Sequence, residues 1–163
     1  MALDGLLLHQ LQKEINTYLP AKLLKIQQIS DAELLFTLRT QKGNQKLMIS
    51  LHSVYNRIHF TQQSYTTMET PGNFTMLLRK LIDGGIIRSC KQLGLDRILH
   101  MIVEARNEMG DIHSYHFYIE LMGKYANLVL VGEDNRIIDA LKRIPPFENN
   151  RRTILPGAQF TLP

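Results

Sequence analysis

The sequence has a single cysteine, no long hydrophobic run and no basic segment at its start, and each of these absences excludes a class of protein. Cys90 alone forms no internal disulfide, which is typical of a protein in a reducing compartment. No apolar stretch approaches the roughly 20 residues of a membrane-spanning helix. The segment Met1 to Gly5 lacks the features of a secretory signal. We therefore expect a cytoplasmic protein that does not interact with a membrane.

Glycine and proline, at ten and six residues, are too few for a collagen-like or low-complexity chain. The length of 163 residues is usual for one domain, so residues 1–163 are expected to form a single domain. A chain of this length buries about 70% of its unfolded surface, and it needs no disulfide or metal to stabilise its core.

Two stretches carry the apolar spacing of an amphipathic helix. The first begins after Asp4, a candidate N-cap, and continues until Pro20 ends it. The second begins at Asn73, also a candidate N-cap, and ends at Gly84-Gly85, where a left-handed residue can cap the last turn.

The rest of the chain has the two-residue periodicity of strands. Residues 22–60 are expected to form antiparallel sheet, with a hairpin turn at Lys42-Gly43-Asn44. Five more strands are predicted at 86–92, 97–107, 115–121, 127–131 and 136–141. The βαβ alternation of a parallel sheet is missing, so the fold class is α+β, with an antiparallel β-sandwich-like body and two helices. The tail after Pro145 shows no periodicity and is expected to be an extended exit segment.

The net charge of +4 is compatible with nucleic-acid binding, and the cations are unevenly distributed. Residues 79–97 hold five cations and two carboxylates, and residues 142–152 hold four cations and one carboxylate. Arg79 and Lys80 fall off the apolar stripe of the second helix and are expected to face solvent or a partner. These clusters are either solvated surface or, if the fold brings them together, a phosphate-binding surface.

Catalytic and metal-binding patterns are missing. The histidines are scattered, and His113 and His116 are three apart on a predicted strand, so they point to opposite faces and are unsuited to sharing a metal. Cys90 is expected to be a small buried apolar residue. There is no nucleophile elbow, no phosphate-binding loop and no distinct carboxylate pair. We therefore expect no enzymatic activity, cofactor or metal.

Polar residues where strands meet turns are the remaining candidates. Asp96-Arg97 opens a strand after Gly94, which places a charged pair at the rim of the sheet. Either this is a structural ion pair, or Arg97 holds a phosphate or a base while Asp96 orients it or accepts a base hydrogen bond. The segment 122–127, with Lys124, Tyr125 and Asn127, is either an ordinary turn or a loop that binds nucleic acid by stacking and charge.

Six ordered motifs resemble a known family. They are Asp4-Gly5, Leu78-Arg79-Lys80 before Gly84-Gly85, Asp96-Arg97, Arg106 to Asp111, Glu120 to Lys124 with Asn127, and Arg152 to Gly157. Together they are similar to the N-terminal NFACT domain of bacterial ribosome quality control factors of the RqcH type. Members are often labelled fibronectin-binding protein A-like, and NEMF is a eukaryotic relative.

The resemblance implies a β-sandwich similar to the N-terminal domain of formamidopyrimidine-DNA glycosylases, within a longer multidomain protein. It also implies binding to a large ribosomal subunit with a stalled peptidyl-tRNA, and recruitment of tRNA for alanine tailing without mRNA. Asp96 and Arg97 match the family's tRNA-contacting pair. Arg79, Lys80, Lys124 and Asn127 are further candidate RNA contacts.

Two departures and two alternatives accompany this resemblance. The chain lacks the N-terminal Pro-Glu of the glycosylases, and it has Lys124-Tyr125-Ala126-Asn127 where the family has Arg-His-Ser-Asn. The alternatives are a surface adhesin that binds fibronectin, as the family label suggests, and a DNA glycosylase-like enzyme, which rests on fold analogy alone.

Overall fold

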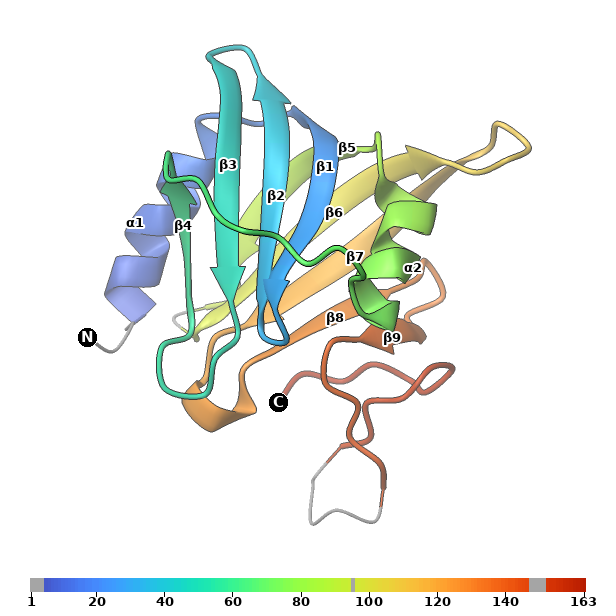
Figure 1. Ribbon diagram of the computed structural model, residues 1–163. Helices are drawn as coiled ribbons and strands as arrows, with labels where there is room; N and C mark the ends of the chain where they lie inside the picture. Colours follow the sequence, from blue (N-terminus) through green and yellow to red (C-terminus); the bar gives the residue numbers. More distant parts are fainter. Residues whose placement is uncertain (1–4, 95, 147–151) are drawn as a thin grey trace.

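The computed structural model describes residues 5–94, 96–146 and 152–163 (Figure 1). Two α-helices, nine strands and a short 3₁₀-helix make up these residues. The helices are α1 (Gly5–Asn16), α2 (Asn73–Ile82) and the 3₁₀-helix η1 (Gly123–Tyr125). The strands are β1 (Ala21–Ser30), β2 (Glu33–Thr40), β3 (Gly43–Ser50), β4 (Arg57–Thr61), β5 (Ile86–Gln92), β6 (Ile98–Arg106), β7 (Ile112–Glu120), β8 (Asn127–Val131) and β9 (Ile137–Ala140).

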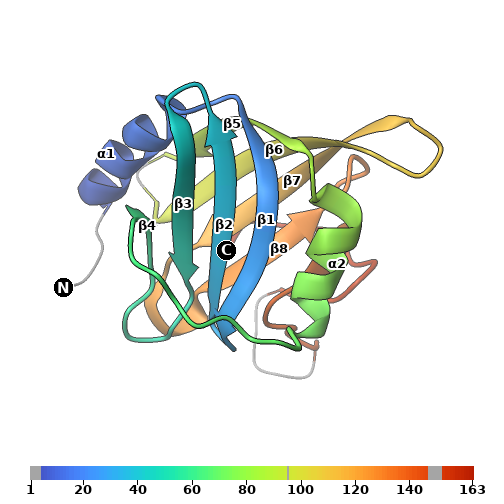
Figure 2. The ribbon, with the colours of Figure 1, turned by 45° about the horizontal axis from the view of Figure 1, so that its top comes forward.

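All nine strands belong to one antiparallel sheet, in the order β4-β3-β2-β1-β5-β6-β7-β8-β9. The sheet folds over on itself, so that β1–β4 face β5–β8 as two layers (Figure 2). Only two residue pairs, Ala21 with Ile87 and Lys22 with Ile86, join the layers through β1 and β5. The prediction of an α+β fold with an antiparallel body and two helices is confirmed.

The core lies between the two layers because every second side chain of each strand points inward. Phe36 of β2 and Phe117 of β7 meet across the layers, with ring centroids 5.9 Å apart. Cys90 is fully buried in the same core, as predicted, and burial raises the pKa of its thiol to about 12. At neutral pH this cysteine is therefore an uncharged packing residue.

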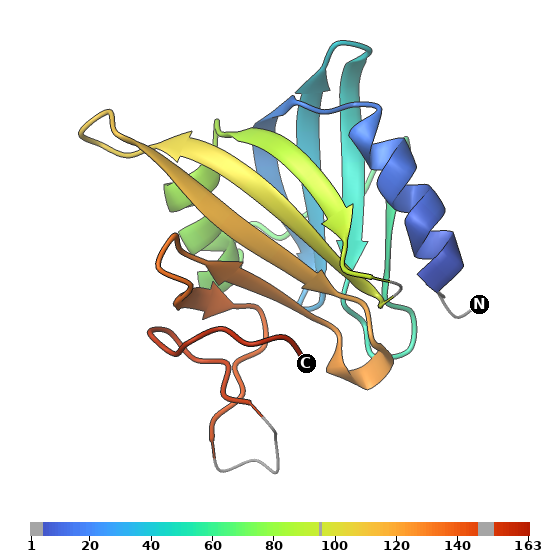
Figure 3. The same cartoon turned by 180° about the vertical axis from the view of Figure 1, so that it is seen from behind.

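Helix α1 lies along the edge formed by β4 and β5 (Figure 3). Its polar side chains hold the backbone of β5: Asn16 Nδ2 donates to the Cys90 carbonyl over 2.6 Å, and Gln12 Oε1 accepts from the Gln92 amide over 2.8 Å. The predicted N-cap Asp4 lies outside the described residues. Neither α1 nor α2 is long and apolar enough to cross a bilayer, as far as the described part of the chain goes.

Helix α2 begins differently from the prediction. Its N-cap is Gly72, and Asn73 is its first helical residue. The cap is supplied by the sheet: the buried Gln28 of β1 accepts hydrogen bonds at Oε1 from the Gly72 amide and from Thr75 Oγ1, each over 2.8 Å. A side chain 44 positions away thus accepts the hydrogen bond of the N-cap amide. The local sequence around α2 cannot reveal this contact.

The glycine stop after α2 is confirmed, and it has two causes. Gly84 has a φ of +78°, which favours glycine. At Gly85 a Cβ would lie 2.8 Å from the Glu104 carbonyl oxygen, so no larger residue fits between α2 and β6. The hairpin between β2 and β3 turns at Gln41 and Lys42, and Gly43 with its φ of +97° is already the first residue of β3.

The prediction of an extended exit segment was wrong for residues 152–163. This segment returns to the body, where Gln159 forms a bridge with Arg136 and Ile154 with Ile144. Ile154 and Phe160 are buried against the outer face of β8 and β9, in a second apolar cluster with Val129 and Val131 among others. The segment lacks periodicity because it buries isolated side chains rather than one face of a strand.

Candidate nucleic-acid interface

Asp96 and Arg97 lie in the tight turn between β5 and β6, directly before the first residue of β6. The Asp96 amide donates to the Leu93 carbonyl, and Gln92 Nε2 donates to the Asp96 carbonyl over 2.9 Å. These two hydrogen bonds hold the backbone of Asp96 in the turn. Asp96 is exposed and Arg97 is half-buried, so the charged pair lies at the surface.

Backbone contacts bring three further loops to the same end of the sheet. The Leu121 amide donates to the Arg97 carbonyl over 2.8 Å, and Asn56 Nδ2 donates to the Gly123 carbonyl over 3.2 Å. Lys142 Nζ donates to the Leu51 carbonyl over 2.8 Å. We call this surface the loop rim, defined as residues 51–56, 93, 94, 96, 97, 121–127 and 141–143. It lies at the lower end of the sheet in Figure 1.

Aromatic rings are exposed on the loop rim beside cations. Tyr125 of η1 is 63% exposed, and Lys124 Nζ lies 5.1 Å from the centre of its ring. Tyr55, in the loop between β3 and β4, is 64% exposed and stacks on His52 at 5.9 Å. The rings of His52 and Tyr55 line an open hollow of about 300 Å³ together with Glu33, Ser50 and Arg57. Exposed rings next to cations are the combination that unpaired nucleic-acid bases stack on.

The sequence predictions missed the loop with His52 and Tyr55. An available signal was a non-periodic stretch between two strands that carries two rings and is followed by Arg57. That signal was weak because nothing in the local sequence places this loop next to Lys124, which is about 70 residues away.

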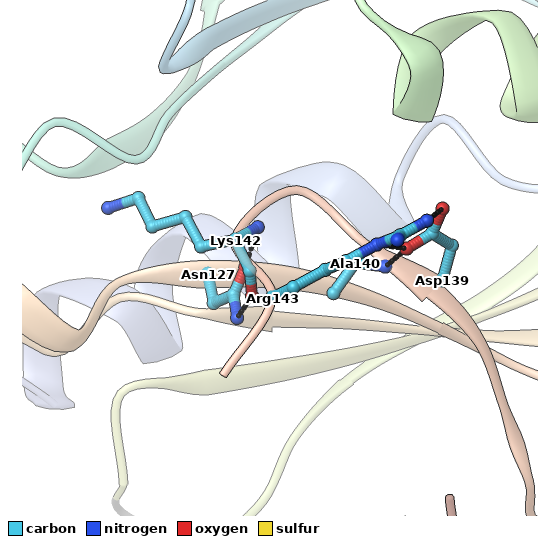
Figure 4. Close-up of polar contacts among 5 residues, drawn as sticks. All are labelled: Asn127, Asp139, Ala140, Lys142 and Arg143. Carbon is cyan, nitrogen blue, oxygen red and sulfur yellow. Dashed lines mark hydrogen bonds and ion pairs between the residues drawn. The ribbon is translucent and has the colours of Figure 1, made fainter. Parts of the chain in front are cut away.

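Asn127, a candidate RNA contact from the sequence, is buried and stabilises the fold. Its side chain is buried, and Nδ2 donates to the Lys142 carbonyl over 2.9 Å while Oδ1 accepts from the amides of Lys142 and Leu128 (Figure 4). Each of its amide atoms is therefore engaged with the backbone. We leave Asn127 out of the candidate interface, because it ties the start of β8 to the segment after β9.

Arg79 and Lys80 lie away from Asp96 and Arg97. Both are on α2, which stands on the opposite side of the molecule from the turn between β5 and β6 (Figures 1 and 3). Arg79 Nε donates to the Ile26 carbonyl over 2.8 Å, which holds α2 on β1, and Lys80 is exposed. The fold therefore does not join the cations of α2 and those of Asp96-Arg97 into one patch.

The described cations of residues 142–152 bind carbonyl and carboxylate groups of the protein itself. Arg143 makes two hydrogen bonds of 3.0 Å to Asp139, as Figure 4 shows. Arg152 pairs with Glu120, which is fully buried, and it also donates to the Thr161 carbonyl over 2.6 Å. Burial lowers the pKa of Lys142 and raises that of Glu120, the second effect being opposed by Arg152. Arg151 lies outside the described residues.

Two of the six histidines, His100 and His116, stack on each other with ring centroids 5.0 Å apart. As predicted, His113 and His116 use opposite faces: His113 contacts Glu133 at 2.9 Å, and His116 contacts His100 at 2.7 Å. His100 also stacks on Tyr118, at 4.5 Å. Desolvation and the neighbouring His116 and Lys91 lower the pKa of His100 to about 4. No group of three or more His, Cys, Asp or Glu residues within 5–94, 96–146 and 152–163 could hold a metal ion.

Comparisons with known proteins identify the family. Residues 4–163 match the family described as NFACT N-terminal and middle domains. The chain is 39% identical over 165 residues to the Rqc2 homolog RqcH of Bacillus subtilis, covering all of this chain and 29% of that protein. It is 31% identical to the ribosome quality control complex subunit 2 of Saccharomyces cerevisiae, covering 92% of this chain and 13% of that protein. The chain thus spans less than a third of these relatives.

A solved structure agrees with this match. The N-terminal domain of the fibronectin-binding protein PavA from Streptococcus pneumoniae superimposes with a TM-score of 0.94 at 34% identity, over 98% of this chain and 61% of that one. A sequence match over almost the whole chain and the same fold lead to one conclusion. The chain belongs to the family of NFACT N-terminal and middle domains.

Proposed function

We propose that this chain is the RNA-binding part of a ribosome quality control factor in the cytoplasm. In this proposal the loop rim contacts tRNA through Asp96 and Arg97, assisted by Lys124. The whole protein binds a large ribosomal subunit that carries a stalled peptidyl-tRNA, and it recruits tRNA so that alanine is added to the nascent chain without mRNA. The names of the relatives, RqcH and ribosome quality control complex subunit 2, support the ribosomal setting.

The observation that carries the tRNA proposal is the composition of the loop rim. It places a half-buried arginine, an exposed carboxylate, an exposed lysine and two exposed tyrosines at one end of the sheet. Arginine and lysine bind phosphates, a carboxylate accepts hydrogen bonds from bases, and tyrosines stack on unpaired bases. The proposal assigns peptide transfer to the ribosome, so this domain contributes by binding and positioning and needs no cofactor or metal.

The test is tRNA binding by the full-length protein with Arg97→Ala, compared with Arg106→Ala at the other end of β6. We expect Arg97→Ala to weaken tRNA binding by about 1–3 kcal/mol and to reduce its salt dependence. Arg106→Ala is expected to leave binding unchanged, and both variants should fold. Equal affinities of the wild type and of Arg97→Ala would refute the assignment of the site.

Binding of fibronectin is the second candidate function, because the solved structure with the same fold is named a fibronectin-binding protein. Cell fractionation separates the two candidates. A tRNA-binding factor is expected with the ribosomes, whereas an adhesin has to be found on the outer surface of the cell. The glycosylase-like fold and activity remain sequence-based expectations, and incubation with oxidised or abasic duplex DNA tests the activity.

A further inference from the structure

The hairpin between β6 and β7 projects beyond the rest of the molecule (Figures 1 to 3). We call its end, residues 106–112, the hairpin tip. Each of these residues is exposed, and Met109 is 85% exposed, more than any other large apolar side chain of the described residues. Ile112, at the base of the tip, is 55% exposed. The hairpin tip thus presents two apolar side chains at the end opposite to the loop rim.

The hairpin tip is held in one conformation by its own hydrogen bonds. Asn107 Oδ1 accepts from the amides of Met109 and Asp111, over 3.0 and 2.9 Å, and the Asn107 amide donates to the Asp111 carbonyl. Arg106 Nη1 donates to the carbonyl of Gly110, whose φ of +83° closes the turn. A preorganised loop loses little conformational entropy on binding, so the exposed methionine is well placed to act as an anchor.

The charges around Met109 favour a protein partner over a nucleic acid. Glu108 and Asp111 flank it, and the neighbouring turn between β8 and β9 adds Glu133 and Asp134. Four carboxylates against two arginines, Arg106 and Arg136, give this end a net negative charge. A negative surface repels a phosphate backbone and complements lysines and arginines on a protein. Methionine is flexible and polarisable, and it suits apolar pockets on partner proteins.

A hollow beside the hairpin tip adds a second contact surface. It has a volume of about 290 Å³ and lies between Ile112 and the Gly84-Gly85 turn that follows α2. Its wall carries two carboxylates, Asp83 and Glu104, and two arginines, Arg88 and Arg106, and Arg88 is paired with Glu104. The projecting Met109 therefore stands next to an open hollow whose wall has charges of both signs. The apolar side chain fits an apolar pocket on a partner, and the hollow gives the rim of that pocket polar groups of both charges to contact.

We propose that the hairpin tip docks on a protein of the large ribosomal subunit, with Met109 in an apolar pocket that lysines or arginines flank. The inference rests on the proposed function, since that function supplies the subunit as the partner. It assigns separate tasks to the two ends of the sheet: the loop rim holds tRNA, and the hairpin tip holds ribosomal protein.

The test measures how the full-length protein binds purified large ribosomal subunits with stalled peptidyl-tRNA. Met109→Asp is expected to weaken binding by about tenfold, because it places a carboxylate in an apolar pocket. Met109→Leu keeps size and polarity and is expected to bind as the wild type does. Unchanged binding by Met109→Asp would overturn the docking proposal. Since residue 109 is exposed, both variants are expected to fold, which thermal unfolding checks.

A photo-crosslinking amino acid at position 109 identifies what the hairpin tip touches on the subunit. The proposal expects a crosslink to a ribosomal protein, and none from the same amino acid at Lys42, in the exposed turn between β2 and β3. A crosslink from position 109 to rRNA or tRNA would overturn it.

Binding of free tRNA separates this proposal from the proposed function. Met109→Asp should bind free tRNA normally, and Arg97→Ala should not. If Arg97→Ala behaves as expected while Met109→Asp binds subunits normally, only the docking proposal fails. A wild-type protein that binds neither tRNA nor subunits would refute both.

Discussion

Strand β6 connects two ends of the molecule that differ in charge and in how their side chains are held. The loop rim at its start has four cations and one carboxylate, Asp96, among its described residues. Of these cations, Lys142 donates to the Leu51 carbonyl and Arg143 is paired with Asp139, while Arg97 and Lys124 are the candidate RNA contacts. The hairpin tip and the adjacent turn between β8 and β9 have four carboxylates and two arginines, Arg106 and Arg136. The modest net charge of +4 therefore arises from two ends of opposite charge, with the loop rim positive and the hairpin-tip end negative. Two ends of opposite charge can bind two different partners.

The two ends also differ in the origin of their rigidity. The loop rim is assembled from four loops that are distant in the sequence, and buried contacts such as those of Asn127 hold them together. The hairpin tip is held by exposed contacts within seven residues. A change in a buried contact of the loop rim should therefore affect stability, whereas a change at the hairpin tip should affect only the local surface.

The largest expected effect concerns the ion pair at the end of β7 next to the loop rim. Arg152→Ala removes the partner of the fully buried Glu120 and should lower the free energy of unfolding by about 3–5 kcal/mol. The loss should shrink as the pH falls, because the unpaired carboxylate is then protonated. The control is Arg88→Ala, which removes the exposed Arg88–Glu104 pair near the other end and should cost less than about 1 kcal/mol. Urea unfolding measures both variants. If Arg152→Ala and Arg88→Ala lower the free energy of unfolding by similar amounts, the proposed difference between the two ends is wrong.

The second effect compares two asparagines that each accept two backbone hydrogen bonds. Asn127→Ala leaves backbone groups of the half-buried Lys142 and the buried Leu128 without partners and should destabilise the protein by about 2 kcal/mol. Asn107→Ala opens the hairpin tip to water and should cost below about 1 kcal/mol. Denaturant unfolding of both variants provides the measurement. A larger loss for Asn107→Ala would mean that the hairpin tip contributes to the stability of the body.

The third effect sharpens the comparison through binding. Tyr55→Ala removes an exposed ring from the loop rim and should weaken tRNA binding of the full-length protein by about 1–2 kcal/mol, the usual contribution of one base stacked on an aromatic ring. Met109→Ala removes an exposed apolar side chain from the hairpin tip and should leave tRNA binding unchanged. Titration with labelled tRNA measures the affinity of both variants. Weaker tRNA binding by Met109→Ala would mean that tRNA contacts the hairpin tip, which contradicts the proposed assignment.

The smallest effect concerns the middle of β6, between the two ends. His100 has a pKa of about 4 in the folded protein and a usual value of 6.5, so the unfolded chain binds more protons between these two values. The free energy of unfolding should therefore fall as the pH is lowered from 6.5 toward about 4. In His100→Gln this part of the decline disappears; because His100 is partly exposed, we expect a difference below about 1 kcal/mol. Unfolding in urea at several pH values measures it, and identical pH profiles would contradict the assignment.

Periodicity predicted most of the fold. The strands at 86–92 and 127–131 have the predicted bounds, and both helices were placed correctly. The helices and β5 bury one face against the core, and β8 is a short apolar run that is buried on both faces. The strand predicted at 115–121 begins three residues earlier, because β7 spans Ile112–Glu120. The larger errors occurred where a side chain distant in the sequence takes part. Gln28 caps α2 in place of Asn73, and the segment 152–163 packs on β8 and β9 instead of leaving the body.

The sequence by itself determined the α+β class, the buried state of Cys90 and the turn that carries Asp96 and Arg97, since these depend on periodicity and on residues a few positions apart. Only the tertiary structure decided that Tyr55 and Lys124 share an end of the sheet with Arg97, that Arg79 and Lys80 do not, and that Asn127 is buried. The physical reason is that strand pairing fixes which loops meet. That pairing depends on how the sheet folds over its core, and no short segment of the chain encodes it.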